Sequence, residues 1–384
     1  MAFSINHLTP VIFGNNVSSE TGTRVKESGC TNVLFIYERG VQDAGITDDI
    51  IESITALGIK SVIYDGVKAD PPEYTIEEAA EIGRSERVDG VVAIGGGSSM
   101  DTAKAVNILL GNPSPISQYM VMGARTEPGK LLFLLPTTSG TGSEVTPIAV
   151  ITDSRENRKG GIMGPACRAT MAIVDPVLTT GMPPSITADT GMDAFSHAAE
   201  AITSSMANPM SDILAEKAIN LICSYLPRAV KNGNDMEARE KMSFAAMIAG
   251  YAFADSIPHL GHAIGHTLGS MFHVPHGNGC GVALPEVMEY ISDKIAVAVT
   301  RVGNAMGLDI SDNLSPGEIG EKVADAIKDL NKQTGLKTLK EHNIDESALQ
   351  DVAETAMSDL SIRFSPKETN SGDILKMLQS AYSR

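Results

Sequence analysis

The first 180 residues alternate short apolar runs with segments of helical length, and this alternation restricts the chain to few architectures. The apolar runs are rich in β-branched and aromatic residues and are bounded by turn residues, as strands are. They cover residues 33–37, 61–64, 90–94, 131–135 and 172–174. Between them, segments such as 48–57, 76–85 and 100–110 have helical spacing, which predicts a mainly parallel sheet. We therefore expect an α/β, Rossmann-like domain over residues 1–180.

The strand signals end after the sequence Gly-Met-Pro-Pro-Ser at residues 181–185, and later runs such as 211–226 and 236–253 keep helical periodicity. A chain of 384 residues is also longer than one core usually supports. We therefore predict a second, all-helical domain over residues 181–384.

Charge and cysteine content exclude several classes of partner. A net charge of -17 argues against binding to nucleic acid or an anionic membrane, because both require a positive surface. No apolar run approaches the roughly 18 residues of a membrane helix, and the first residues lack the basic and apolar pattern of a secretory leader. The four cysteines form no CxxC pair. We expect a cytoplasmic protein with reduced thiols.

Six of the eight histidines lie in two short segments. They are His197, shortly after Asp193, and His259, His262, His266, His273 and His276. Residues four apart share one face of a helix, so Asp193 with His197, and His262 with His266, can each direct two side chains at one centre. A carboxylate and imidazoles suit Fe²⁺, Zn²⁺ or Mn²⁺. The grouping predicts a catalytic metal site, although helix packing alone could explain any single histidine.

A glycine turn, Gly95-Gly96-Gly97-Ser98, joins an apolar run to a helical segment. Glycines let the backbone approach a pyrophosphate closely, and a helix N-terminus offers it unpaired N–H groups. An ordinary tight turn would have the same composition, but the position after the third strand of an α/β domain favours a nucleotide site. The loop 136–146, rich in Ser, Thr and Gly, also follows a strand and could line the same nucleotide.

Glu38 closes what the sequence presents as the first strand, where a carboxylate can bind the adenosine ribose hydroxyls and repel a 2′-phosphate. This position predicts a preference for NAD(H) over NADP(H). The neighbouring Arg39 could instead attract that phosphate, and both residues could also be solvated loop charges.

Four motifs follow one another along nearly the whole chain. They are the glycine turn with Asp101 and Lys104, the 136–146 loop, Gly191-Met192-Asp193-Ala194 with His197, and His262-xxx-His266-x-Leu268-Gly269 ending in Pro275-His276-Gly277. In this order they resemble the iron-containing alcohol dehydrogenase family, which includes lactaldehyde reductases and propanediol dehydrogenases. The glycerol dehydrogenase and dehydroquinate synthase group shares the domain layout, but its metal pattern is less similar.

The resemblance implies a Rossmann-like domain followed by an all-helical metal domain, and a homodimer or larger homo-oligomer. It implies that Asp193, His197, His262 and His276 hold the metal, and that His266 lies close to the nicotinamide and the substrate. It further implies that Gly96, Gly97 and Ser98 bind the pyrophosphate. Thr137 and Thr138 would border the adenosine, Lys159 would reach a ribose, and Asp101 would belong to the cofactor site.

These features predict a metal-dependent, NAD(H)-linked alcohol dehydrogenase or aldehyde reductase for short substrates. The metal, Fe²⁺ or else Zn²⁺ or Mn²⁺, would act as a Lewis acid while hydride passes to or from the nicotinamide. We assign His266 a proton-relay role because it lies one helical turn from His262.

The substrate is less constrained by the sequence. Phe253 is expected to form an apolar wall, while His259 and Arg363 lie near segments that the family places around the substrate. Their charge would suit an aldehyde with a carboxylate or sulfonate, unless they are a packed histidine and a surface arginine. His273 is given no metal role, and His7 and His342 are interpreted as surface residues.

Two other functions fit part of the pattern. In the first, a metal-dependent hydrolase or lyase would bind a phosphorylated substrate at the glycine turn. In the second, a metal-stabilised binding protein would have no catalytic role, but the nucleotide features would then be unexplained.

Overall fold

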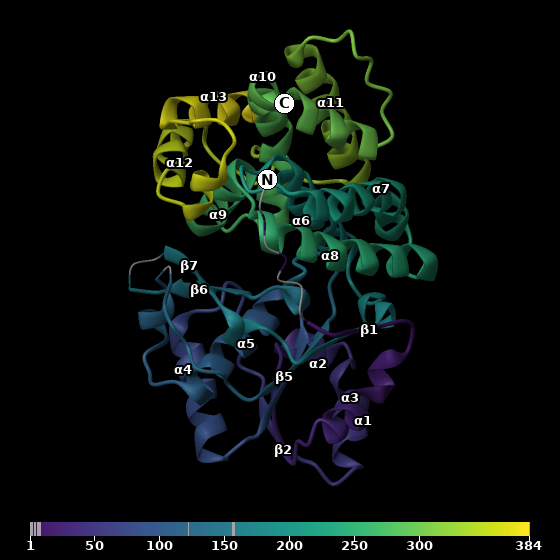
Figure 1. Ribbon diagram of the computed structural model, residues 1–384, viewed down its shortest axis with the longest axis vertical. Coiled ribbons are helices and arrows are strands. Elements are labelled where there is room, and N and C mark those ends of the chain that lie inside the picture. The colour runs from purple at the N-terminus through teal and green to yellow at the C-terminus, as the bar shows by residue number, and fades with distance from the viewer. Residues whose placement is uncertain (1–2, 4, 6–8, 122, 156–157, 384) are drawn as a thin grey trace. The chain divides into compact units, whose positions relative to one another are not determined.

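The computed structural model describes all residues except 1–2, 4, 6–8, 122, 156–157 and 384. The chain divides into two compact units, which Figure 1 colours by residue number. One unit contains residues 9–138 and 142–181, and the other consists mainly of residues 182–384 and includes 139–141. His7 lies outside the described residues.

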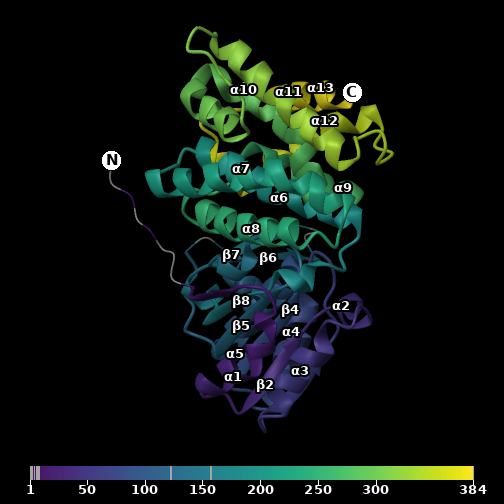
Figure 2. The same cartoon turned by 90° about the vertical axis from the view of Figure 1, so that its right-hand side faces the viewer.

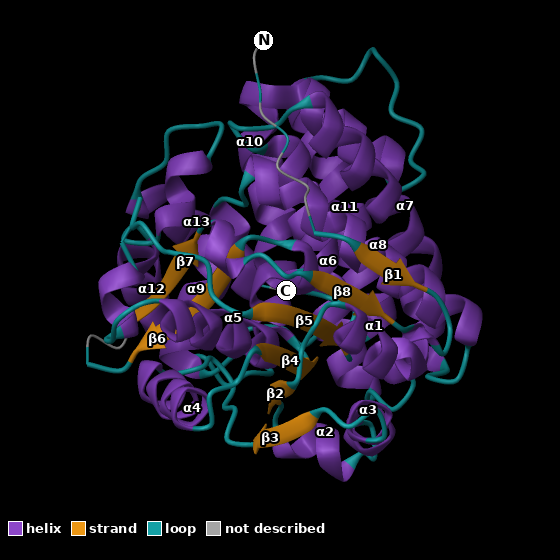
Figure 3. Ribbon diagram, turned by 60° about the horizontal axis from the view of Figure 1, so that its bottom comes forward, coloured by secondary structure: helices purple, strands orange, loops and turns teal. Residues whose placement is uncertain are grey.

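The first unit is built on a six-stranded sheet whose neighbouring strands all pair in parallel. Its strands stand in the order β1-β8-β5-β4-β2-β3, which can be followed in Figure 3. Their bounds are β1 Val11–Phe13, β2 Asn32–Ile36, β3 Lys60–Tyr64, β4 Gly90–Gly95, β5 Leu131–Pro136 and β8 Met171–Val174. Five of these strands coincide with the predicted apolar runs, and the expected α/β class is confirmed.

Alternate strand residues supply two apolar cores, one on each face of the sheet. Leu34, Val91 and Leu132 belong to one core, together with residues of α4 (Glu73–Ser85) and α5 (Gly97–Gly111). Val33, Val92 and Phe133, each adjacent to one of these residues in its strand, belong to the other core with α1 (Thr21–Glu27) and α3 (Thr47–Thr55). Successive side chains of a strand point to opposite faces, so a sheet covered on both sides reads as an uninterrupted apolar run.

Two features of this unit differ from the sequence prediction. The short strand β1 precedes β2, so Glu38 follows the second strand of the chain rather than the first. β6 (Ile148–Asp153) and β7 (Arg158–Met163) form an antiparallel hairpin outside the main sheet. β1 is only three residues long, and the hairpin contains polar and glycine residues, so neither resembles a continuous apolar run. A five-residue helix, α2 (Arg39–Asp43), follows Glu38.

The second unit is helical, as predicted, and its described residues contain no strand. Its helices are α6 Pro184–Thr203, α7 Pro209–Lys231, α8 Met236–Ser256, α9 Leu260–Phe272, α10 His276–Ala305, α11 Pro316–Thr334, α12 Leu349–Ala356 and α13 Ser371–Tyr382. Asn208, Ser315 and Asn370 form capping boxes at the starts of α7, α11 and α13, which fixes where these helices begin. α6, α7 and α8 pack against one another (Figure 2).

None of the helices in the described part of the chain is both long enough and apolar enough to span a membrane.

Candidate functional site

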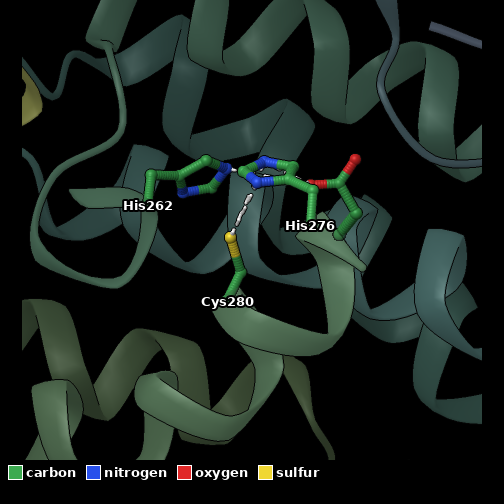
Figure 4. Close-up of side chains that lie close together, drawn as sticks. His262, His276 and Cys280 are labelled. Atoms are coloured by element: carbon green, nitrogen blue, oxygen red, sulfur yellow. Dashed lines mark hydrogen bonds and ion pairs between the residues drawn. The ribbon is translucent and has the colours of Figure 1, made fainter. Parts of the chain in front are cut away.

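Three helices of the second unit bring a compact group of donor side chains together. Asp193 comes from α6, His262 from α9, and His276 and Cys280 from the first turns of α10. One donor atom from each of the four lies within 4.8 Å of the others. Figure 4 shows His262 and His276 directed toward each other with Cys280 beside them. The predicted histidines and aspartate thus meet at one place, and a cysteine lies there with them.

The carboxylate of Asp193 lies at the middle of the histidines. Its Oδ1 is 3.4 Å from His276 Nε2, 3.9 Å from His262 Nε2 and 3.7 Å from His197 Nδ1. Asp193 and His197 are four residues apart on α6 and therefore share a face, as the sequence predicts.

His197 lies outside the group of four donors but adjoins it. Its ring centroid is 4.4 Å from that of His262, and on another side it stacks on Phe253 at 4.1 Å and 14°. Burial, together with the neighbouring His262 and His266, holds the pKa of His197 well below its usual range. His197 is therefore a neutral imidazole, the form that binds metals. Phe253 covers this ring with an apolar face.

The donor set fits a divalent metal ion. In the part of the chain that the structure describes, His197 Nδ1 and His262 Nε2 are buried without a hydrogen-bond partner. Buried polar atoms are rarely left in this state, and a metal ion would supply the missing partner. Three imidazoles with a carboxylate are a chemistry that Fe²⁺ and Zn²⁺ both accept.

A buried carboxylate that the sequence analysis missed, Glu200, holds His262 in place. Glu200 has no exposed surface, and it accepts hydrogen bonds from the backbone N–H groups of His259, Gly261 and His262. Its Oε2 also lies 2.5 Å from His262 Nδ1. When His262 donates Nδ1–H to this carboxylate, its Nε2 is the nitrogen left for a metal.

The hydrogen bonds and ion pairs around Glu200 shift the pKa values of both Glu200 and His262. Burial alone would raise the pKa of Glu200, but the charges of His259 and His262 and the hydrogen bonds lower it to about 2. Burial lowers the pKa of His262, but the bond and charge of Glu200 outweigh this effect, so that the pKa is raised. Glu200 follows Asp193 by seven residues and His197 by three, so the same helical spacing could have revealed it.

A second missed carboxylate, Asp359, binds His266. Asp359 Oδ2 lies 2.9 Å from His266 Nδ1, and His266 itself stacks on His276 at 4.9 Å. Burial opposes ionisation of Asp359, but the charge and hydrogen bond of His266 lower its pKa to about 2. Asp359 lies 93 residues from His266, and no local spacing connects them.

The structure places the two predicted substrate cations differently. Arg363 is exposed in the short 3₁₀ segment Leu360–Phe364, whose N-cap residue is Asp359. His259 is fully buried, with Nε2 2.8 Å from Thr203 Oγ1 and Nδ1 3.2 Å from Glu200 Oε1. Burial lowers the pKa of His259 more than Glu200 raises it. His259 therefore offers a substrate no accessible surface, and we replace its predicted role with support of Glu200.

The two remaining described histidines lie outside the donor group. His273 is exposed and ends α9 in a left-handed conformation. His342 is not a plain surface residue, because it is half-buried and its Nε2 lies 3.0 Å from Asn278 Oδ1.

In the α/β unit, the predicted glycine turn lies between β4 and α5. Gly95 ends β4 with φ at +152°, and a Cβ there would lie 2.3 Å from Ser99 Oγ, so the turn requires glycine. Gly96 is the N-cap of α5, and Gly97 and Ser98 form its first turn. Thr137 and Thr138 follow the adjacent strand β5, and a Cβ on Gly96 would contact Thr138 at 3.3 Å. The turn, the helix N-terminus and the two threonines therefore lie together, an arrangement suited to a pyrophosphate.

The other predicted cofactor residues have partners within the same unit. Asp101 accepts hydrogen bonds from Ser143 Oγ and from the N–H of Val150, which ties α5 to the following segments. Lys159, on β7, forms an ion pair of 2.6 Å with Asp70. Their roles toward a cofactor remain predictions.

Glu38 is the exposed N-cap residue of α2. The adjacent Arg39 forms an ion pair of 2.7 Å with Asp65.

Comparison with known proteins supports the whole-chain resemblance. The family model "Iron-containing alcohol dehydrogenase" matches residues 9–176, and the model of the C-terminal part of the Fe-containing alcohol dehydrogenase family matches residues 187–382. The choline dehydrogenase of Bacillus subtilis is 34% identical over 365 residues, which cover 94% of this chain and 90% of that protein.

Solved structures show the same similarity. A crystal structure of 1,3-propanediol oxidoreductase superposes with a TM-score of 0.94 at 32% identity, covering 99% of this chain and 100% of that one. Sulfoacetaldehyde reductase from Bifidobacterium kashiwanohense, solved in complex with NAD⁺, gives 0.91 at 30% identity, covering 100% and 99%. With both units matched, the chain belongs to the iron-containing alcohol dehydrogenase family of oxidoreductases.

Proposed function

We propose that this protein is a metal-dependent, NAD(H)-linked alcohol dehydrogenase or aldehyde reductase for short-chain substrates. The observation that carries the proposal is the buried donor group around Asp193, in which ring nitrogens of His197 and His262 lack a hydrogen-bond partner among the described residues. We propose Asp193, His197, His262 and His276 as the metal ligands. Family membership favours Fe²⁺, and Zn²⁺ or Mn²⁺ would suit the same donors.

The side chains around the proposed metal site have separate roles. When bound, the metal supplies Lewis-acid polarisation of the substrate oxygen, and the nicotinamide carries the hydride. Glu200 orients His262, and Phe253 keeps water from one face of His197. Asp359 fixes the ring of His266, so that Nε2 is the nitrogen that would exchange a proton.

Four observations support NAD(H) as the cofactor. The glycine turn at the start of α5 suits a pyrophosphate, and a solved relative was crystallised with NAD⁺. Glu38 follows β2, where a carboxylate would bind ribose hydroxyls and disfavour a 2′-phosphate. The guanidinium of Arg39, which could have attracted that phosphate, is paired with Asp65.

The relatives leave the charge of the substrate open. One is named for choline, a cation, and another for sulfoacetaldehyde, an anion, at similar identity to this chain. Arg363 is exposed and follows Asp359, the partner of His266, by four residues, and a guanidinium suits a carboxylate or sulfonate. We therefore propose a short aldehyde that bears an anionic group.

The test is anaerobic NADH oxidation by Fe²⁺-loaded protein with matched neutral, anionic and cationic short aldehydes. We expect turnover that a chelator abolishes, with the highest kcat/KM for an anionic aldehyde. Replacing Arg363 by Ala should lower kcat/KM for the anionic aldehyde about tenfold, which corresponds to about 1.4 kcal/mol. The kcat/KM for the neutral aldehyde should be unchanged. Equal values across charges would contradict the anionic substrate. No turnover with NADH or NADPH at full metal occupancy would favour a hydrolase or lyase.

His266 gives a second expected result. His266→Ala should lower kcat about 10²-fold, the lower end for loss of a general acid or base, and should alter the pH–rate profile. Metal content should stay at the wild-type level, because His266 is not a proposed ligand. His273→Ala, an exposed histidine at the end of the same helix, is the matched control. Full metal content with an unchanged pH profile in His266→Ala would rule out the relay.

A further inference from the structure

Cys280 occupies a position that the four proposed ligands do not explain. It lies four residues after His276 on α10, on the same face of that helix, and has no exposed surface. Its Sγ is 3.8 Å from His276 Nδ1 and 3.7 Å from His276 Nε2 (Figure 4). Among the described residues, it is the one cysteine that groups with carboxylate and imidazole donors.

The packing around α9 directs this sulfur toward the donor group. Gly265 lies between His262 and His266 on α9, and a Cβ there would be 2.5 Å from Cys280 Sγ and 3.0 Å from Cys280 N. A larger residue at position 265 would therefore displace the sulfur. The absence of a side chain on Gly265 lets the Sγ lie against the helix that carries His262.

The distances are close to those of a shared metal ion. In a tetrahedral site whose donors are about 2.0–2.3 Å from the metal, two donors are about 3.3–3.8 Å apart. Cys280 Sγ and His276 Nε2, at 3.7 Å, and Asp193 Oδ1 and His276 Nε2, at 3.4 Å, already lie within this range. No pair in the group exceeds 4.8 Å, so a contraction of about 1 Å or less would bring all four donors onto one ion.

We propose that Cys280 is a sulfur ligand of this metal centre, in addition to the carboxylate and imidazole donors. The inference rests on the proposed function, because it assumes that the donor group binds a metal. On binding, the metal–sulfur bond replaces the S–H bond, and the proton is released to solvent. A thiolate donor favours Zn²⁺ and Co²⁺ over harder ions, so this site would bind zinc more readily than one made of oxygen and nitrogen alone.

Cobalt(II) is the probe, because a cobalt–thiolate bond gives a near-ultraviolet charge-transfer band that nitrogen and oxygen ligands do not give. Metal-free protein is loaded anaerobically with one equivalent of Co²⁺ and compared with Cys280→Ser and Cys223→Ser, the latter a cysteine on α7 outside the donor group. We expect the band in the wild type and in Cys223→Ser. Cys280→Ser should lose it while keeping the visible d–d bands and a native circular dichroism spectrum.

The outcomes separate this inference from the proposed function. If the wild type binds cobalt and shows the d–d bands but no charge-transfer band, Cys280 is not a ligand, and the proposed metal site is unaffected. A band that persists in Cys280→Ser also overturns it. If neither the wild type nor any variant binds cobalt, the metal site itself is wrong, and the inference falls with it.

One further measurement covers a Cys280→Ser variant that takes up no cobalt. In that case, X-ray absorption spectra of the Zn²⁺-loaded wild type and Cys223→Ser show whether sulfur is bound to the metal. A sulfur scatterer at about 2.3 Å in both supports the ligand, and a shell of nitrogen and oxygen alone refutes it.

Discussion

Asp193→Asn is expected to lower kcat/KM for aldehyde reduction by about 10³-fold, since loss of Lewis-acid assistance costs several kcal/mol and each 1.4 kcal/mol is tenfold. Asp193 Oδ1 lies within 3.9 Å of nitrogens of His197, His262 and His276, so its carboxylate is the anionic donor that these histidines share. Asparagine keeps the shape but removes the charge. The measurements are steady-state kinetics and metal content after dialysis, and both should fall.

Asp351→Asn, at an exposed position on α12, is the matched control and should retain metal and activity. An Asp193→Asn enzyme that holds a full equivalent of metal at wild-type kcat/KM would remove Asp193 from the ligand set. If activity is lost while the metal stays fully bound, the role of Asp193 is in turnover and not in affinity.

Glu200→Gln is expected to weaken metal binding about 10–100-fold, the usual effect of removing the carboxylate that orients a ligating histidine. It should also destabilise the fold by about 1–3 kcal/mol, because three backbone N–H groups and His262 would lose a charged acceptor. Competition with a chromophoric chelator measures the affinity, and urea unfolding of metal-free protein measures the stability. Glu321→Gln, exposed on α11, is the control.

The stability difference should depend on pH with a definite sign. The pKa of Glu200 falls from 4.5 to about 2 on folding, so its ionised form stabilises the native state. That contribution is complete above about pH 4.5 and is lost as the pH falls toward 2. Glu200 also raises the pKa of His262 above 6.5, a contribution that is present below pH 6.5 and is lost as the pH rises through the raised value. The gap in stability between wild type and Glu200→Gln should therefore be widest between pH 4.5 and 6.5 and should narrow on either side. A gap that widens below pH 4.5 would contradict the network described here.

The α/β unit was predictable because a doubly covered sheet leaves a strong local pattern. Runs such as Val33–Tyr37 and Leu131–Leu135 are apolar on both faces of the strand, and the glycine turn directly follows another such run, residues 90–94. β1 and the β6–β7 hairpin were missed because their residues do not give that pattern. Their pairing depends on contacts distant in sequence, such as Val11 beside Ala172.

The donor histidines were predictable for a similar local reason, since Asp193 and His197 share a face of α6. The supporting carboxylates were not found: Glu200 shares the helical spacing of Asp193 and His197 but was not examined for it, while Asp359 is recognised only by its bond to the distant His266. His259 shows the opposite error, since a histidine near the cluster can serve a carboxylate instead of a substrate. Cys280 was overlooked because the cysteines were examined for pairs with one another and not for spacing from a histidine.

α6 carries Asp193, His197 and Glu200 on a single rigid element, while α10 carries His276 and Cys280. The spacing within α6 changes only by insertion or deletion, which would displace the two proposed ligands and their supporting carboxylate together. On α10, a single codon change at position 280 could exchange sulfur for oxygen or carbon without altering the backbone. A lineage built on this framework could therefore change its metal preference through one residue while its hydride chemistry stays the same.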